Sequence, residues 1–172
     1  FEVPPGSYMI KNSKGKKIER YWELPICKPN DHTCFNVQDA AEEFEKIFSD
    51  SVKLRLRADV QVAAYLSGGL DSSITTSFIK QVSPEKLRTF SIGFTEKDFD
   101  ESSYQNIAAS YFNTEHSSVT CSEKDISNHF KDVVWFTESP LLRTAPTPMS
   151  LLSKSVQDKN IKVVITGEGA DE

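Results

Sequence analysis

From residue 61 onward, the hydrophobic and polar positions follow two alternating patterns. Four runs have the length and composition of strands, and the third of them is the most polar: 61–67, 87–94, 114–121 and 162–166. Four segments between these runs have apolar residues at helical spacing: 72–81, 102–112, 123–137 and 147–158. Strands that alternate with helices predict an α/β fold, with a parallel sheet and helices on both of its faces.

The first part of the chain has a different pattern. Two short strand-like runs flank a turn at Ser13–Gly15, which predicts a β-hairpin that ends a preceding β-rich domain. Asn36 stands before apolar positions at helical spacing and is expected to cap a helix. The predicted organisation is therefore a domain tail over 1–24, a linker over 25–35, and the first part of an α/β domain over 36–172. Because the sequence stops soon after a strand, we expect a piece of a longer protein.

Composition narrows the class of partner. The chain has 172 residues, 38% of them hydrophobic and 26% charged, with a formal net charge of −5. An acidic chain is poorly suited to neutralising phosphates along a nucleic acid, so no nucleic-acid partner is expected. The sequence has no apolar run of transmembrane length and no signal-peptide pattern, so we expect a cytoplasmic protein without a membrane partner.

The stretch SGGLDSS, residues 67–73, carries the strongest chemical signal. Gly68 and Gly69 allow the backbone to turn sharply between a buried strand and a helix. The first N–H groups of a helix are unpaired and partly positive, so they favour an anion. Ser67, Ser72 and Ser73 could add hydroxyl donors. The plainer alternative is a tight turn in which Asp71 only caps the helix.

Two further loops are expected beside this one. GFTEKDFDES and TGEGADE also follow strands, and the carboxyl ends of parallel strands meet at one edge of the sheet, where ligands of such folds bind. The glycine-rich loop has neither the Walker A spacing nor the dinucleotide G-x-G-x-x-G spacing. The sequence therefore predicts a phosphate site of another kind.

These residues resemble a known family. SGGLDS is similar to the pyrophosphate loop of the N-type ATP pyrophosphatases, also called PP-loop enzymes. TFSIGF, APTPMSLLSK and KVVITGEGADE resemble successive blocks of glutamine-hydrolysing asparagine synthetases, and PPGSYM with RYWELP resembles the end of their glutaminase domain. The resemblance implies adenylation of the aspartate side chain by ATP with release of pyrophosphate, followed by amidation with ammonia derived from glutamine. It thus implies a ligase of asparagine biosynthesis with small-molecule substrates.

The resemblance also implies site residues. Leu66 would contact the adenosine, Ile92 would offer backbone groups to adenine, and Glu168 would support formation of the acyl-adenylate. Some family members place an arginine facing the pyrophosphate at the position of Arg143. The implied nucleotide-binding set is Leu66, Ser67, Gly68, Gly69, Leu70, Asp71, Ser72, Ser73, Ile92, Thr166 and Gly167.

The negative charge of the carboxylates and of pyrophosphate predicts a bound metal ion. A carboxylate beside pyrophosphate would repel it unless a cation lay between them, so Asp71 and Asp171 are candidate ligands of Mg²⁺.

Several alternatives stay open at this point. A β-lactam synthetase or a tRNA-modifying adenylase could share the same loop, and a non-catalytic nucleotide-binding module could keep it. Since the chain starts at Phe1 and lacks the N-terminal cysteine of glutaminase domains, the chain itself is not expected to hydrolyse glutamine. An uncovered edge at 162–166 would favour self-association, so a homo-oligomer also stays open.

Overall fold

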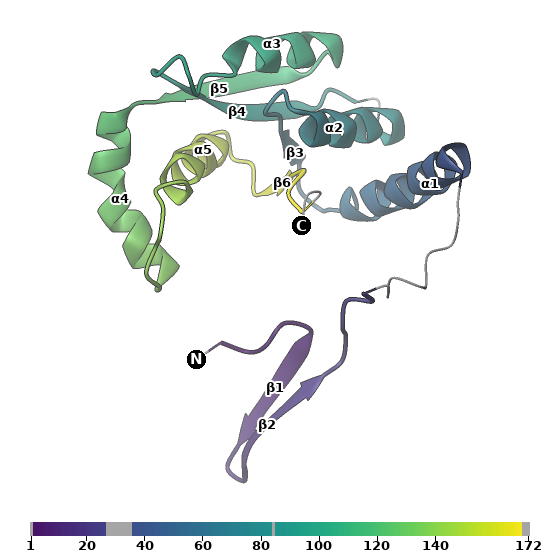
Figure 1. Cartoon of the computed structure of the whole chain (residues 1–172), viewed down its shortest axis with the longest axis vertical. Helices are drawn as coiled ribbons and strands as arrows, with labels where there is room; N and C mark the ends of the chain where they lie inside the picture. Colours follow the sequence, from purple (N-terminus) through teal and green to yellow (C-terminus); the bar gives the residue numbers. More distant parts are fainter. Residues whose placement is uncertain (1, 27–35, 84, 170–172) are drawn as a thin grey trace. The chain divides into compact units, whose positions relative to one another are not determined.

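The computed structural model describes residues 2–26, 36–83 and 85–169 of the chain (Figure 1). It divides into two compact units, Phe1–Ala40 and Ala41–Glu172. No helix among the described residues is both long and apolar enough to cross a membrane.

The first unit contains the predicted hairpin. Strands β1 (Ser7–Asn12) and β2 (Gly15–Arg20) pair in antiparallel register, with Asn12 opposite Gly15. The Asn12 side chain accepts a hydrogen bond from the Lys14 backbone N–H at 2.9 Å, and Gly15 has a φ of 134°, which suits glycine at the turn. Helix α1 (Val37–Arg55) begins in this unit and continues into the next. As predicted, Asn36 caps it, because its Oδ1 accepts from the Asp39 N–H at 2.9 Å.

The described residues of the second unit include a four-stranded parallel sheet. Its strands are β3 (Val62–Tyr65), β4 (Arg88–Phe94), β5 (Glu115–Cys121) and β6 (Val163–Ile165). They lie in the order β5-β4-β3-β6, and every pairing is parallel. The predicted fold class, a parallel α/β sheet preceded by a β-hairpin, is therefore confirmed. The strand that ends before Thr166 forms one edge of this sheet.

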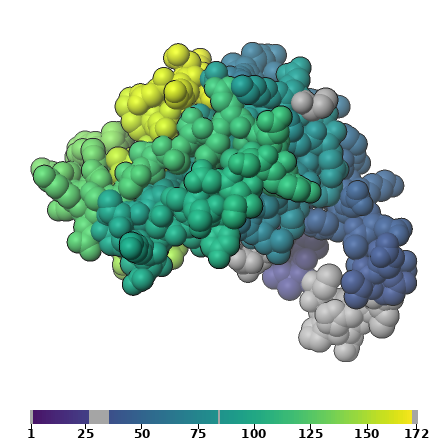
Figure 2. Space-filling model, turned by 90° about the horizontal axis from the view of Figure 1, so that it is seen from above, coloured from purple at the N-terminus to yellow at the C-terminus, as the bar shows by residue number. Residues whose placement is uncertain are grey.

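Helices cover both faces of the sheet. They are α2 (Leu70–Val82), α3 (Ser102–Tyr111), α4 (Glu123–Thr137) and α5 (Pro146–Asp158). Figure 1 shows α4 and α5 on the side of the sheet opposite α3. The outer surface of α3, in teal and green in Figure 2, carries three exposed apolar side chains: Tyr104, Ile107 and Tyr111.

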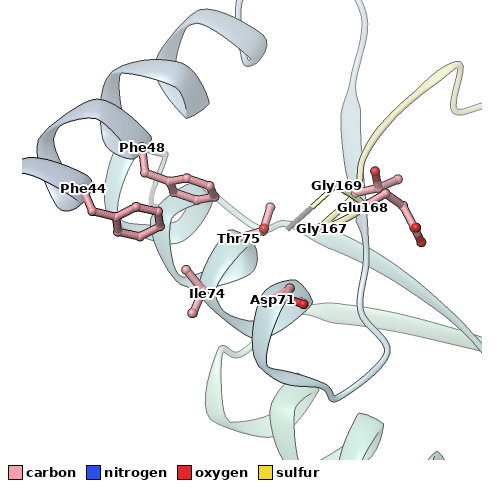
Figure 3. Close-up of a pocket in the computed structure, with 9 residues that line it drawn as sticks. Phe44, Phe48, Asp71, Ile74, Thr75, Gly167, Glu168 and Gly169 are labelled. Atoms are coloured by element: carbon pink, nitrogen blue, oxygen red, sulfur yellow. The ribbon is translucent and has the colours of Figure 1, made fainter. Parts of the chain in front are cut away.

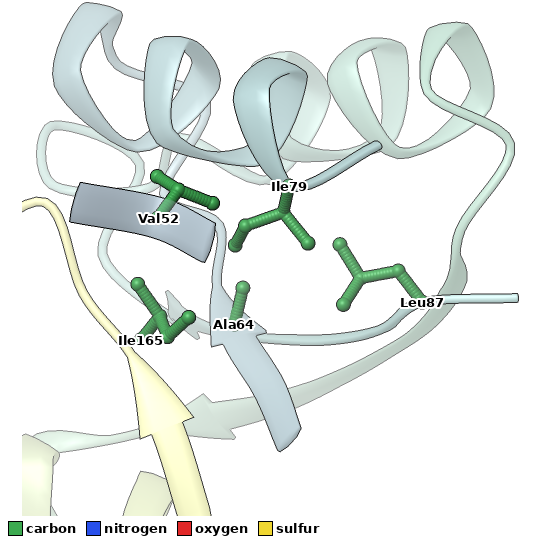
Figure 4. Packing of buried hydrophobic residues seen from close by; sticks show 5 residues of the cluster. All are labelled: Val52, Ala64, Ile79, Leu87 and Ile165. Atoms are coloured by element: carbon green, nitrogen blue, oxygen red, sulfur yellow. The ribbon is translucent and has the colours of Figure 1, made fainter. Parts of the chain in front are cut away.

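Two adjacent alanines of β3 belong to two different hydrophobic cores, one on each face of the sheet. Ala64 packs in a cluster with residues of α1, α2, β6 and the segment before β4: Val52, Ile79, Leu87 and Ile165 (Figure 4). Ala63 faces the other way and packs with Phe90, Leu152, Val156 and Ile161, which brings α5 onto the second face. Successive strand residues point to opposite faces, so a continuous apolar run is what a strand covered on both sides requires.

The polar character of β5 also has a structural explanation. His116 on β5 lies between two hydroxyls of β4, with Nδ1 at 2.9 Å from Thr89 Oγ1 and Nε2 at 3.0 Å from Ser91 Oγ. Thr89 Oγ1 is also 2.8 Å from Thr114 Oγ1. Burial lowers the pKa of His116 below its usual value, because the charged ring would lose hydration. This network joins β4 to β5 through side-chain hydrogen bonds.

Candidate functional site

The glycine-rich loop joins β3 to the first turn of α2. Gly69 is the N-cap of α2, and no side chain caps the helix there. The loop is held from within, because Ser67 Oγ lies 2.9 Å from Ser72 Oγ and accepts from the Gly69 N–H at 3.2 Å. Ser72 Oγ also donates to the Gly69 carbonyl at 3.2 Å. Because the first N–H groups of a helix have no intrahelical acceptor, this end of α2 offers donors of the kind that an anion site requires.

Gly68 allows this loop to approach α3. Its φ is 84°, a conformation that residues with a side chain rarely adopt. A Cβ at this position would lie 2.8 Å from the backbone N of Gln105 and 2.9 Å from Cβ of Tyr104. The loop therefore packs directly on the backbone of α3, and only glycine fits there.

A second loop, Thr166–Gly169, leaves β6 beside the first. A Cβ on Gly167 would lie 3.0 Å from both the carbonyl carbon of Asp71 and the backbone N of Ser72. The close approach of these two backbones places Glu168 near the first turn of α2. Asp71 is half-buried there, whereas Glu168 is exposed.

The strand-end cavity, of about 170 Å³, opens where β3 and β4 end. Thirteen residues line it, and most are apolar or aromatic: Tyr65, Leu66, Ser67, Phe90, Ser91, Ile92, Phe94, Phe99, Glu101, Gln105, Met149, Leu152 and Glu168. Its rim between Phe94 and Ser102 is fixed by Asp100, whose Oδ1 accepts from the Phe94 N–H at 3.1 Å and from Ser102 Oγ at 2.6 Å. The Ser102 hydroxyl, and then the Phe94 amide, lower the pKa of Asp100. An apolar slot with a few polar groups is the usual form of a small-molecule site.

The α1–α2 cavity, of about 400 Å³, lies on the other side of the Thr166–Gly169 loop. Its lining comes from α1, α2 and that loop: Phe44, Phe48, Asp71, Ile74, Thr75, Thr166, Gly167, Glu168 and Gly169. In Figure 3 the rings of Phe44 and Phe48 lie side by side, and the Glu168 side chain points away from them. Glu168 lines both cavities, so it stands at the boundary between them.

The structure brings most of the predicted site residues together. Leu66, Ser67 and Ile92 line the strand-end cavity, and Asp71, Thr166 and Gly167 line the α1–α2 cavity. Gly68, Gly69, Leu70, Ser72 and Ser73 complete the loop between them. Arg143 is exposed between α4 and α5 and lines neither cavity, and Asp171 falls outside the described residues.

Several residues that line these cavities were not predicted as site residues. Gln105 and Phe99 line the strand-end cavity, and Phe44 and Phe48 line the other. The sequence did hold a signal for Gln105, since it is a polar residue four positions before the buried Ala109 on the same helix face. Phe99 reaches the strand-end cavity because its loop folds back over the strand ends, and the spacing of residues along the sequence does not reveal such a fold.

The described residues contain no group of three or more His, Cys, Asp or Glu side chains placed to hold a metal ion. Mg²⁺ in nucleotide sites is usually held by one or two carboxylates together with phosphates and water. Half-buried Asp71, in the first turn of α2, fits such a role.

Comparison with known proteins gives the family. The model of the asparagine synthase family matches residues 43–172, so the chain belongs to that family. A Methanocaldococcus jannaschii protein, provisionally named asparagine synthetase (glutamine-hydrolysing) 2, is 37% identical over 100% of this chain and 33% of its own length. Asparagine synthetase (glutamine-hydrolysing) 1 of Bacillus subtilis is 32% identical over 99% of this chain and 26% of its own length. The chain thus spans about a third or less of these curated relatives.

Among solved structures, an NH3-dependent NAD synthetase from Campylobacter jejuni matches 71% of this chain and 54% of its own, with 16% identity and a TM-score of 0.48.

Proposed function

We propose that this member of the asparagine synthase family forms the ATP-binding part of a ligase that converts aspartate to asparagine. In the first step an oxygen of the aspartate side-chain carboxylate attacks the α-phosphorus of ATP. The bond between the α-phosphorus and the bridging oxygen breaks, and pyrophosphate leaves. Ammonia, supplied from glutamine, then attacks the carbonyl carbon of β-aspartyl-AMP. AMP leaves, and the nitrogen loses a proton to give asparagine.

The observation that carries the proposal is the position of the glycine-rich loop. Its Ser67 lines the strand-end cavity, and the Thr166–Gly169 loop packs on its other end, at Asp71 and Ser72 in the first turn of α2. A nucleoside in the strand-end cavity would direct its phosphates toward the first amides of α2. Donors that wait where negative charge develops stabilise the transition state, and here that charge develops on the leaving pyrophosphate.

The side chains around the loop have separate proposed roles. Leu66 and Ile92 would hold the adenosine from the walls of the strand-end cavity. Glu168 would support formation of the adenylate, because it lies where the two cavities meet. Asp71, with Asp171, would hold Mg²⁺, which would offset the phosphate charge when bound. Arg143 would have to reach the pyrophosphate from outside both cavities, so its role depends on how the loop between α4 and α5 is placed in the complex.

The division of the chain is part of the same proposal. Residues 1–24 would end a glutaminase-like domain, 25–35 would link it to the next domain, and 36–172 would begin the synthetase domain. Ammonia made in the first domain would then be used in the second. We expect such a protein to act in the cytoplasm on small molecules.

Product analysis of the protein that contains this chain tests the reaction. Incubation with ATP, Mg²⁺, aspartate and ammonium should give AMP and pyrophosphate by phosphorus NMR, together with asparagine. ADP and orthophosphate would refute adenylation. A β-lactam synthetase would instead require a substrate with its own internal amine, so release of asparagine separates the two alternatives.

A variant of Glu168 tests the site. Glu168→Gln should lower asparagine formation about 100-fold or more, the scale of a positioned catalytic group. Exchange of labelled pyrophosphate into ATP should fall together with synthesis if Glu168 supports adenylate formation. Glu45→Gln is the matched control, because Glu45 is exposed on α1 and lines neither cavity. Wild-type synthesis by Glu168→Gln would exclude Glu168 from the site.

A further inference from the structure

Gln105 is a buried polar residue with half of its amide unused. It lies on α3, and the residue is only 3% exposed. Its Nε2 donates a hydrogen bond to the carbonyl oxygen of Ile92 on β4 at 2.9 Å. Its Oε1 is buried and has no hydrogen-bond partner within the part of the chain that the structure describes. Most buried side-chain acceptors have a partner, so this atom requires an explanation.

The assignment of the two amide atoms is fixed by the bond to Ile92. A carbonyl oxygen can only accept, so the amide atom that contacts it must be the nitrogen. The free atom of Gln105 is therefore the oxygen, an acceptor that needs a donor.

The surroundings of Gln105 indicate where that donor would come from. Gln105 lines the strand-end cavity together with Ile92, and the other walls are largely aromatic or apolar: Phe90, Phe94, Phe99, Met149 and Leu152. Aromatic and apolar walls suit a flat ring system. The Ile92 carbonyl uses one of its two lone pairs on Gln105, so two acceptors lie close together beside this cavity.

We propose that Gln105 Oε1 accepts a hydrogen bond from the exocyclic amine of adenine and makes the cavity selective for ATP. This inference rests on the proposed function, which places the nucleotide in the strand-end cavity. The amine of adenine carries two hydrogens and so matches neighbouring acceptors. Hypoxanthine has an oxygen at the same position, and that oxygen would face the acceptors without a hydrogen bond. Gln105 is thus a specificity-determining residue that contacts the base.

Nucleotide binding to the purified protein that contains this chain tests this role. Dissociation constants of ATP and ITP, each with Mg²⁺, would be measured by calorimetry for the wild type and for Gln105→Met. A site that hydrogen-bonds one substrate group rejects the analogue lacking it, so the wild type should bind ATP at least about 10-fold more tightly than ITP. In Gln105→Met the preference should fall to about 3-fold or less, since the buried acceptor is gone. Gln81→Met, an exposed glutamine on α2, is the matched control and should keep the wild-type ratio.

The ratio of the two constants does not depend on how much of a variant is folded. Gln105→Leu provides a second variant, and circular dichroism checks that each one folds. An unchanged ATP to ITP ratio in both Gln105 variants, or no preference in the wild type, would overturn the proposal. A variant that loses preference for ATP over 2′-deoxy-ATP but not over ITP would assign Gln105 to the ribose and would also overturn it. Absence of ATP binding to the wild type would refute the nucleotide site itself, which is a distinct result.

Discussion

Replacement of Gly68 by alanine tests whether the glycine-rich loop must pack on α3. Gly68 has a φ of 84°, and a left-handed conformation costs a residue with a Cβ about 1–2 kcal/mol. The new Cβ would also lie 2.8 Å from the backbone N of Gln105 and from the carbonyl carbon of Tyr104. These are backbone atoms that cannot rotate away, and overpacking of this kind costs about 1–3 kcal/mol.

The expected net loss follows from these terms. The two costs together give about 2–5 kcal/mol, and the lower entropy of the unfolded alanine chain offsets about 0.4–1 kcal/mol of that. We therefore expect Gly68→Ala to lower the free energy of unfolding by about 3 kcal/mol. With a urea dependence of about 2 kcal/mol per molar, the unfolding midpoint should fall by about 1.5 M, measured by far-ultraviolet circular dichroism.

Gly69 provides the control at the next position. Its φ is −74°, and a Cβ there would approach only Ser67 Oγ, at 3.3 Å. Gly69→Ala should therefore shift the midpoint by less than about 0.5 M, because the lower entropy of the unfolded chain offsets a weaker N-cap. If Gly68→Ala and Gly69→Ala unfold at the same urea concentration, the close contact between the loop and α3 does not exist in solution.

Three further predictions concern groups around the sheet. The free energy of unfolding should fall as the pH drops from 7 to 5, because burial depresses the pKa of His116 below its unfolded value of 6.5 and the unfolded chain therefore takes up the proton first. His116→Gln should make the urea midpoint less dependent on pH over this range. A pH dependence equal to that of the wild type would contradict the assignment to His116. Ser122→Ala should cost about 1 kcal/mol in thermal or urea unfolding, because Ser122 and Asp125 form a capping box at α4, whereas a neutral result would show that the cap does not form. Asp100→Ala should raise the rate of amide hydrogen exchange at Phe94, because the Asp100 carboxylate accepts a hydrogen bond from the Phe94 N–H. Unchanged protection of this amide would show that other contacts hold the rim of the cavity.

Much of the fold was predictable because burial on two faces leaves a clear mark in the sequence. The apolar run that contains Ala63 and Ala64 has no polar alternation, which is what a strand between two helical layers requires. The start of α2 was predicted less accurately, because the helix begins at Leu70 and the sequence pattern placed its start at residue 72. Gly69 acts as the N-cap although it has no side chain to mark the position.

The cavity walls were harder to predict than the loop. The carboxyl ends of parallel strands meet at one edge of the sheet. The order of strands and loops along the sequence was therefore enough to predict that Ser67, Ile92 and Glu168 lie near one another. Met149 reaches the same cavity from α5, which crosses the opposite face, and its contact depends on how that helix packs. Local periodicity identifies the buried side of a helix, but it does not say which strand end that side covers.

The serines of the glycine-rich loop also have a structural part that their sequence did not indicate. Ser72 is buried, and its hydroxyl donates a hydrogen bond to the Gly69 carbonyl. Ser67 Oγ accepts from the Gly69 N–H and lies against Ser72 Oγ. These hydrogen bonds hold the shape of the turn, and the first amides of α2 are the phosphate donors in the proposed function. Since Gly167 packs on this same turn at Asp71, the shape that these serines hold also sets where Glu168 stands.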